Sequence, residues 1–145
     1  MKIVVREGSI EEIFQVHQGI PEFYEEVAIE FYKERLKGRI FLALVAEQNG
    51  ELVGFKVGYQ SQKPDVLYSW MGGVRPAFRK SGAATALADF QEVWATKNGF
   101  KKVFFKTRNR FPDMIKFGLG RDFKIVEVIR KDRVEDFRIV MVKKL

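Results

Sequence analysis

The pattern of apolar and polar positions predicts a strand and two helices at the start of the chain. Residues 2–5 form a short apolar run, which is typical of a strand. Ser9 followed by Glu12 has the spacing of a capping box, and the apolar residues that follow recur with the helical period. Pro21 is expected to open a second helix as a first-turn proline, and this helix should end near Gly38.

Three strands are predicted next. Two longer apolar runs, 40–47 and 52–59, lie on either side of Asn49-Gly50, and this dipeptide is the strongest short-range signal for a β-hairpin. A third apolar run predicts a strand over residues 66–74.

Helical and strand patterns alternate in the second half of the chain. The predicted elements are a helix over 83–97, a strand over 101–107, a short helix over 112–119, and a closing hairpin of 123–130 and 135–142. The order is therefore β-α-α-β-β-β-α-β-α-β-β, with no internal repeat and no linker. This order predicts a mixed α/β fold, an α+β sandwich, in a single domain that spans residues 1–145.

Composition excludes several kinds of chemistry. The chain has no cysteine, so disulfides, zinc–thiolate clusters, iron–sulfur sites and a cysteine nucleophile are excluded, and no metal site is expected. The one histidine, His17, shares a helical face with apolar residues and is expected to be a packed side chain rather than a base. No apolar run approaches the ~20 residues of a membrane span, and the start of the chain turns acidic too soon for a signal peptide. We therefore expect a cytoplasmic protein that does not bind membranes.

Charge is distributed unevenly along the chain. Residues 1–60 carry 7 basic and 10 acidic side chains, a net charge of −3, whereas residues 61–145 carry 19 and 9, a net charge of +10. A field of this sign attracts an anionic partner, such as nucleic acid, a phosphorylated cofactor or an acidic surface. A solvated basic face explains the same excess. The small acidic excess of the first half favours, weakly, a cationic substrate.

The segment from Gly72 to Thr85 combines small and basic residues at a strand-to-helix junction. The N-terminus of a helix exposes unpaired N–H groups and carries partial positive charge, so such a junction can bind an anion. Gly82 lets a ligand approach the backbone closely, and Arg79 and Lys80 add full charges. An ordinary turn with exposed basic residues explains the same pattern, and the physical argument leaves both interpretations open.

A family resemblance favours the first interpretation. Residues 79–84, Arg-Lys-Ser-Gly-Ala-Ala, match the Arg/Gln-x-x-Gly-x-Gly/Ala motif of the GCN5-related N-acetyltransferase (GNAT) superfamily. The preceding Gly-Val-Arg-Pro-x-Phe-Arg looks like the strand that enters this loop in the same superfamily. Downstream, Asn109 and Asp122-Phe123 resemble its second segment, which is usually Asn…Gly-Phe. The element order fits along essentially the whole chain, which implies a GNAT-like mixed, mostly antiparallel sheet flanked by helices.

The resemblance implies that the chain binds acetyl-CoA. In this family the loop amides hold the pyrophosphate, and the end of the preceding strand pairs its backbone with the pantetheine arm. By the same analogy, strands 66–74 and 101–107 splay apart so that the thioester lies between them. The expected cofactor-binding residues are Gly72, Gly73, Val74, Arg79, Lys80, Ser81, Gly82, Ala83, Ala84, Thr85 and Asn109. For Asn109, a turn-forming role within 108–110 is an equal alternative.

The mechanism that the resemblance implies is direct attack of an amine on the thioester, whose carbonyl the N–H of Val74 would polarise. In the family, a tyrosine in the helix before the last hairpin commonly protonates the leaving thiolate. That position is Gly118 in this chain, with Phe117 beside it. The strand 66–71 also lacks the carboxylate that often serves as the base. Because a thiol has a low pKa, a thiolate leaving group tolerates the loss of the acid.

Catalytic residues are therefore unknown, with two weak candidates. Tyr68 is expected to alternate with Trp70 and Gly72 on one face of the strand and to line an acceptor pocket, although packing explains Tyr68 equally well and Trp70 better. Tyr24 lies in the expected second helix, which borders the acceptor site in the family.

We predict from this an acetyl-CoA-dependent N-acetyltransferase with an unidentified amine acceptor. One alternative is a non-catalytic acyl-CoA-binding module. Another is a nucleic-acid-binding domain, because residues 101–111 interleave basic and aromatic side chains, a pattern that strand packing also explains. The terminal strand 135–142 could pair with a second copy in a homodimer.

Overall fold

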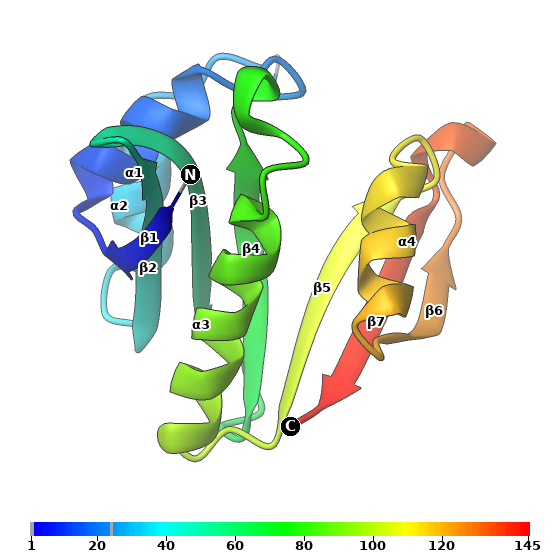
Figure 1. Ribbon diagram of the computed structural model, residues 1–145. Helices are drawn as coiled ribbons and strands as arrows, with labels where there is room; N and C mark the ends of the chain where they lie inside the picture. The colour runs from blue at the N-terminus through cyan, green and yellow to red at the C-terminus, as the bar shows by residue number, and fades with distance from the viewer. Residues whose placement is uncertain (1, 24) are drawn as a thin grey trace.

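The computed structural model describes residues 2–23 and 25–145, and its elements follow the predicted order (Figure 1). The strands are β1 (Ile3–Glu7), β2 (Phe41–Gln48), β3 (Glu51–Gln60), β4 (Val66–Val74), β5 (Lys102–Arg108), β6 (Lys124–Ile129) and β7 (Arg138–Lys144). The helices are α1 (Ile10–Gln18), α2 (Glu30–Leu36), α3 (Ala83–Lys97) and α4 (Pro112–Gly120), and two short 3-10 turns are η1 (Pro76–Phe78) and η2 (Val134–Asp136). The predicted mixed α/β class is confirmed.

The structures that local sequence motifs predict are present where interactions between neighbouring residues alone are enough to form them. The N–H of Glu12 donates to Ser9 Oγ at 3.1 Å, and the N–H of Ser9 donates to a carboxylate oxygen of Glu12 at 3.0 Å, which completes the capping box of α1. Asn49 and Gly50 have φ values of 54° and 76°, the left-handed pair that a tight two-residue hairpin turn requires. The bounds predicted for β4 and α3 are also confirmed.

The second helix is shorter than predicted. It begins at Glu30 rather than at Pro21, which lies in a turn. The reason is tertiary: the Phe23 ring stacks on His17 with the centroids 4.7 Å apart and lies edge-on to Phe55 at 6.2 Å, so this segment packs into the core as an irregular chain. Tyr24, one of the two weak catalytic candidates, lies outside the described residues.

One seven-stranded sheet runs through the molecule, in the order β1-β2-β3-β4-β5-β7-β6. Every neighbouring pair is antiparallel except β4–β5, which is parallel. This pair has only three rungs, the last of which joins Tyr68 to Phe104. Beyond that rung the two strands diverge, as the resemblance implied, and Figure 1 shows the sheet opening into two arms.

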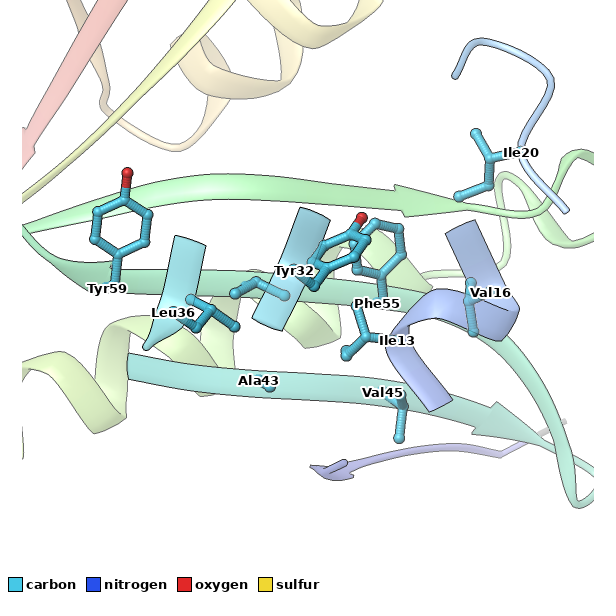
Figure 2. Close-up of a cluster of buried hydrophobic side chains, with 10 residues drawn as sticks. Ile13, Val16, Ile20, Tyr32, Leu36, Ala43, Val45, Phe55 and Tyr59 are labelled. Atoms are coloured by element: carbon cyan, nitrogen blue, oxygen red, sulfur yellow. The ribbon is translucent and has the colours of Figure 1, made fainter. Parts of the chain in front are cut away.

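Helices cover the sheet unequally. Helices α1 and α2 pack on one face of β2–β4, where Ile13, Tyr32 and Phe55 lie at the centre of the core cluster shown in Figure 2. Helix α3 covers the opposite face of the same arm, and α4 packs on the other arm, on the same side of the sheet as α3 (Figure 1). His17 is packed as predicted: it is buried, its Nδ1 lies 2.6 Å from the Tyr32 hydroxyl, and burial lowers its pKa below the usual value.

The last strand lies inside the sheet. β7 begins at Arg138 rather than at residue 135 because η2 occupies residues 134–136. β7 is hydrogen-bonded to β5 on one side and to β6 on the other, so it has no free edge for the pairing across a homodimer that the sequence suggested. The edge of this arm is β6. In the part of the chain that the structure describes, no helix has both the length and the apolar character of a membrane span.

Candidate active site

The opening between β4 and β5 begins at an irregularity in β4. The register of β3 and β4 shifts between the pairs Val57–Met71 and Gly58–Ser69, so Trp70 is an extra residue in β4. Tyr68 and Trp70 therefore pack on the side of α1 and α2, whereas a Cβ at Gly72 would lie 3.5 Å from Lys56 Cγ. The prediction that Tyr68, Trp70 and Gly72 share one face is wrong, because the bulge reverses the alternation.

The backbone of β4 is unpaired along this opening. The N–H of Arg75 donates to the carbonyl of Val53 at 2.8 Å. Because antiparallel pairs alternate, this bond and the register place Gly72 and Val74 at positions whose N–H and C=O groups point away from β3. On that side β5 has already diverged. The Val74 carbonyl accepts a hydrogen bond from Arg79 Nε, but the N–H and C=O of Gly72 and the N–H of Val74 can pair with another extended, amide-containing chain.

The loop after β4 leads into the first turn of α3. Gly82 precedes this helix with a φ of 93°, a left-handed conformation, and makes no side-chain capping hydrogen bond. The Ser81 hydroxyl donates to the Phe78 carbonyl at 2.5 Å and fixes the loop. Ala84 and Thr85 are exposed while Ala83 is buried, and the first N–H groups of a helix have no partner within the helix itself. This geometry suits an anion such as a phosphate group.

Arg79 positions this loop. Its guanidinium binds the Glu22 carboxylate through two nitrogens at 2.7 and 2.8 Å, and its Nε donates to the Val74 carbonyl at 3.0 Å. These hydrogen bonds lower the pKa of Glu22. Arg79 thus joins the end of β4 to the segment before α2, in addition to adding charge. Glu22 is distant in the sequence, and no spacing in the chain could have indicated this pair. Lys80 is exposed and has a left-handed φ of 61°.

Asn109 is engaged within the protein. Its Nδ2 donates to the Val134 carbonyl at 2.9 Å, and its backbone N–H donates to the Phe137 carbonyl at 3.3 Å. Asn109 therefore ties the end of β5 to the β6–β7 connection. These contacts favour the turn-forming alternative over a direct contact with a ligand.

A small pocket lies at the apex of the opening, on the side of α3 and α4. It has a volume of about 10 Å³, room for roughly one water molecule. Ser69 and Phe105, two of its lining residues, are the first residues of β4 and β5 beyond the last paired rung. Gln91 of α3 is 2% exposed, and its Nε2 has no hydrogen-bond partner in the structure. The pocket therefore has an unused hydrogen-bond donor.

Lys56 extends from β3 into the same pocket. Burial lowers its pKa to about 8, with Arg121 adding to the shift and Glu92 opposing it. The Glu92 carboxylate already binds Arg121 at 2.9 Å and Lys143 at 2.5 Å, so cations outnumber carboxylates around the pocket. Sequence reasoning missed Lys56. The only signal was a lysine in the middle of an otherwise apolar strand.

Gly118, the position at which the family usually has a tyrosine, has no space for a larger side chain. A Cβ at Gly118 would lie 2.8 Å from Phe105 Cζ and 2.9 Å from Met141 Cε, closer than real Cβ contacts. The Phe105 ring thus fills the space in front of Gly118, and a larger residue there would require the core to move. The ionisable side chains that line the neighbouring pocket are Lys56, Glu92 and Arg121.

Tyr68, the other catalytic candidate, lies on the opposite face at the last paired rung. Its ring stacks on Phe104 with the centroids 4.6 Å apart, and Lys106 Nζ lies 5.6 Å from the ring centre. Burial raises the pKa of Tyr68, so its hydroxyl stays protonated at neutral pH.

The fold and this opening define a class of protein: a mixed sheet with a divergent parallel pair, an unpaired strand edge, and a helix N-terminus at the end of that edge. Residues 9–117 match the acetyltransferase (GNAT) family. The match spans more than half of the chain, so the protein belongs to the GNAT family. Among curated protein sequences no match was found.

Solved structures share this fold. Ard1 from Thermoplasma volcanium is 20% identical, with a TM-score of 0.84 and coverage of 100% of this chain and 99% of that one. The ribosomal-protein-S18-alanine N-acetyltransferase from Escherichia coli is 14% identical, with a TM-score of 0.84 and coverage of 99% and 94%. An aminoglycoside 6'-N-acetyltransferase complexed with coenzyme A is 17% identical, with a TM-score of 0.79 and coverage of 97% and 96%. At these identities the likeness concerns the fold alone.

Proposed function

We propose that this protein is an N-acetyltransferase that moves an acetyl group from acetyl-CoA to an amine acceptor. The observation that carries the proposal is the edge of β4 at Gly72 and Val74, which neither β3 nor β5 pairs and which a loop connects to the N-terminus of α3, in a chain of the GNAT family. The edge offers backbone partners to the pantetheine amides, and the helix N-terminus offers donors to the pyrophosphate. A coenzyme A complex of a protein with the same fold supports this use of the fold.

The reaction needs few protein groups. The lone pair of a neutral amine attacks the thioester carbonyl, and the Val74 N–H, which points into the opening, donates to the oxygen as it becomes negative. The C–S bond then breaks, the nitrogen loses its extra proton to water, and the coenzyme A thiolate takes up a proton.

We assign the proton on the thiolate to Lys56. Its stem lies across from Gly72, which belongs to the strand segment that would hold the pantetheine arm, and Lys56 lines the pocket at the apex of the opening. A pKa of about 8 leaves most of the amine protonated at neutral pH and is close to that of a thiol, roughly 8.5. Lys56 thereby takes the role that the tyrosine missing at position 118 has in the family.

The alternatives have less support. The aromatic residues of the basic stretch 101–111 are used in packing: Phe105 is buried in the core and Phe104 stacks on Tyr68. This arrangement leaves few rings for stacking on bases. A binding module without activity would share the acetyl-CoA site and differ only in the absence of turnover.

Thermal unfolding with and without acetyl-CoA tests the proposal. At a hundredfold excess over the dissociation constant, binding should add about 2.7 kcal/mol, a shift of several degrees. Arg79→Ala should reduce the shift, and Lys124→Ala, at an exposed position on β6, is the matched control that should retain it. Absence of any shift at millimolar acetyl-CoA, with the wild type folded, would refute acetyl-CoA binding. A shift without acetylation of any amine would leave only the binding module.

A further inference from the structure

We infer that the amine acceptor also carries an acidic group, a carboxylate or a phosphate, which binds to a basic row on β5 and β7. This inference rests on the proposed function and specifies its second substrate. Three side chains make up the row: Lys106, Arg108 and Arg138.

The acceptor must reach the opening from one particular face of the sheet. Helices α3 and α4 cover the other face (Figure 1). The pocket on that side has room for about one water molecule. The proposed acetyl-CoA site begins at the N-terminus of α3 on that covered side. An amine therefore approaches from the face on which α1 and α2 lie, where no described helix covers the β5–β7 arm.

Strand alternation places the basic row on this open face. Val103 and Phe105 belong to the core on the side of α3 and α4, so Phe104, Lys106 and Arg108 point the other way. On β7, Ile139 and Met141 point into the same core, so Arg138 also points to the open face. Lys106 lies over the Tyr68 ring, which places this end of the row beside the last paired rung, at the apex of the opening, with Arg108 and Arg138 farther along the β5–β7 arm.

Two members of the row are directly opposed. Arg108 and Arg138 are cross-strand partners in the β5–β7 ladder. Like charges in this arrangement destabilise a sheet, so the pair points to a ligand that supplies the missing negative charge. Asp136 lies 3.9 Å from Arg108 but 2.6 Å from Arg110, so its carboxylate is already engaged by a third arginine.

Arg108 and Arg138 also line a cavity. It has a volume of about 290 Å³ and is lined by Arg108, Lys131, Asp132, Arg133, Asp136 and Arg138. Four of these six side chains are cationic. The volume suits a small polar group such as an amino acid side chain or a phosphate ester.

The other arm adds to the positive field. The Arg35 guanidinium lies 4.7 Å from the Trp70 ring centre and donates to the Tyr59 hydroxyl at 3.2 Å. Tyr68 thus lies between arginines of both arms, Arg35 and Arg138, and both act to lower its pKa. An acidic acceptor differs from the weak expectation of a cationic one, drawn from the acidic first half of the chain, because β5 and β7 on this face come from the basic half.

Acceptor selectivity tests the inference. Release of coenzyme A is measured with aspartate as the carboxylate arm, phosphoethanolamine as the phosphate arm, and ethanolamine and spermidine as amines without an acid. We expect kcat/KM at least tenfold higher for one or both acidic amines. Arg138→Ala and Arg108→Ala should raise KM for the acidic acceptor tenfold or more without changing the thermal shift given by acetyl-CoA. Lys144→Ala, exposed at the far end of β7, is the matched control and should change neither.

The possible results of these experiments distinguish a failure of the acceptor inference from a failure of the proposed function. If acetyl-CoA stabilises the protein but spermidine or ethanolamine is acetylated as well as the acidic amines, the acceptor inference is wrong and the acetyl-CoA site stands. The acceptor inference is equally wrong if no acidic amine is acetylated and none protects the protein further in the presence of coenzyme A. If acetyl-CoA itself fails to stabilise the protein, the proposed function fails first. Arg138→Glu gives a second test, since it should weaken acidic acceptors more than Arg138→Ala does.

Discussion

At the scale of single residues, the environment of Lys56 differs from the one that its position in the sequence suggests. A lysine on a strand is usually solvated, but this one enters the pocket under α3 and α4, where Gln91 has an unpaired amide. Burial of an ammonium group costs free energy, and proteins retain such groups mainly where the chemistry uses them. The placement has consequences for both stability and catalysis.

The first consequence concerns stability and pH. The pKa of Lys56 is lowered to about 8 in the folded protein from 10.5, so between these values the unfolded chain binds more protons. The free energy of unfolding should therefore rise with pH from about 8 to 10.5 on account of this group. Lys56→Met should be more stable than the wild type at pH 7, by about 3 kcal/mol at most, and should lose this difference above pH 10.5. Urea unfolding across pH measures it. Lys124→Met, at an exposed site, should follow the wild type.

The second consequence concerns catalysis. If Lys56 protonates the leaving thiolate, Lys56→Met should lower kcat by about tenfold to a hundredfold and leave KM for acetyl-CoA little changed. The wild-type kcat should fall as pH rises through about 8, and this fall should be absent in Lys56→Met. An unchanged kcat, or a pH profile that Lys56→Met retains, would contradict the assignment. A purely structural role would change stability but not the pH profile.

Gly118 gives a third prediction at this scale. Restoring the family's tyrosine by Gly118→Tyr should destabilise the protein by about 1–3 kcal/mol, since the new side chain would overlap Phe105 and Met141. It should not raise activity. Gly118→Tyr combined with Phe105→Ala makes room for the ring and should recover part of the lost stability. Equal stability of Gly118→Tyr and wild type in urea would show that the core yields at this point.

At the scale of elements, the edge of β4 and the first turn of α3 work together. The N–H groups of Gly72 and Val74 point into the opening, whereas that of Gly73 points toward Phe55 of β3. In the free protein the amide hydrogens of Gly72 and Val74 should exchange faster than that of Gly73. Acetyl-CoA should slow exchange at Gly72 and Val74, with little change at Gly73. Hydrogen exchange followed by NMR measures all three, and equal effects at all three would indicate global stabilisation rather than pairing along this edge.

The cap of α3 offers a matched pair of variants. Gly82 has a φ of 93°, and nothing lies within 4 Å of a Cβ placed there. Gly82→Asn and Gly82→Asp should cost a similar strain of about 1 kcal/mol, because Asn and Asp tolerate this conformation. Only Gly82→Asp adds negative charge to the proposed pyrophosphate site. Acetyl-CoA should therefore stabilise Gly82→Asn more than Gly82→Asp in thermal unfolding, and equal shifts would place the pyrophosphate elsewhere.

At the scale of the whole molecule, the divergence of β4 and β5 organises the function. One arm consists of β1–β4 with α1–α3 and the other of β5–β7 with α4, and the two arms have separate core clusters. In our proposals the first arm supplies the edge and loop for acetyl-CoA, and the second arm supplies the basic row. Arg79 and Glu22 link the loop of the first arm to the segment before α2. This arrangement would allow one chain to bind the two anionic substrates that we propose in the same opening from opposite faces.

Much of the fold could be predicted because the relevant signals are local. The capping box at Ser9 and the Asn49-Gly50 turn each depend on interactions within a few residues, and each has its expected geometry. The irregular segment after Pro21 could not be predicted, since Phe23 is held by rings from distant elements. The start of β7 was misplaced for a similar reason, as Asp136 in η2 pairs with Arg110, which follows β5 and is distant in the sequence.

The features of the candidate site also fall into two groups, those that the sequence predicted and those that only the structure revealed. The sequence by itself determined the order of elements, the family and the small-residue loop before α3, because hydrophobic period, turn residues and a contiguous motif are properties of neighbours along the chain. Only the tertiary structure decided which face of the sheet Tyr68, Trp70 and Gly72 lie on, and that Arg79 binds Glu22. It also decided that Phe105 fills the space at Gly118 and that Lys56 lines the pocket. These features depend on a one-residue bulge and on side chains from separate strands and helices. The positions of these side chains depend on how the strands and helices pack against one another, and the local sequence does not determine that packing.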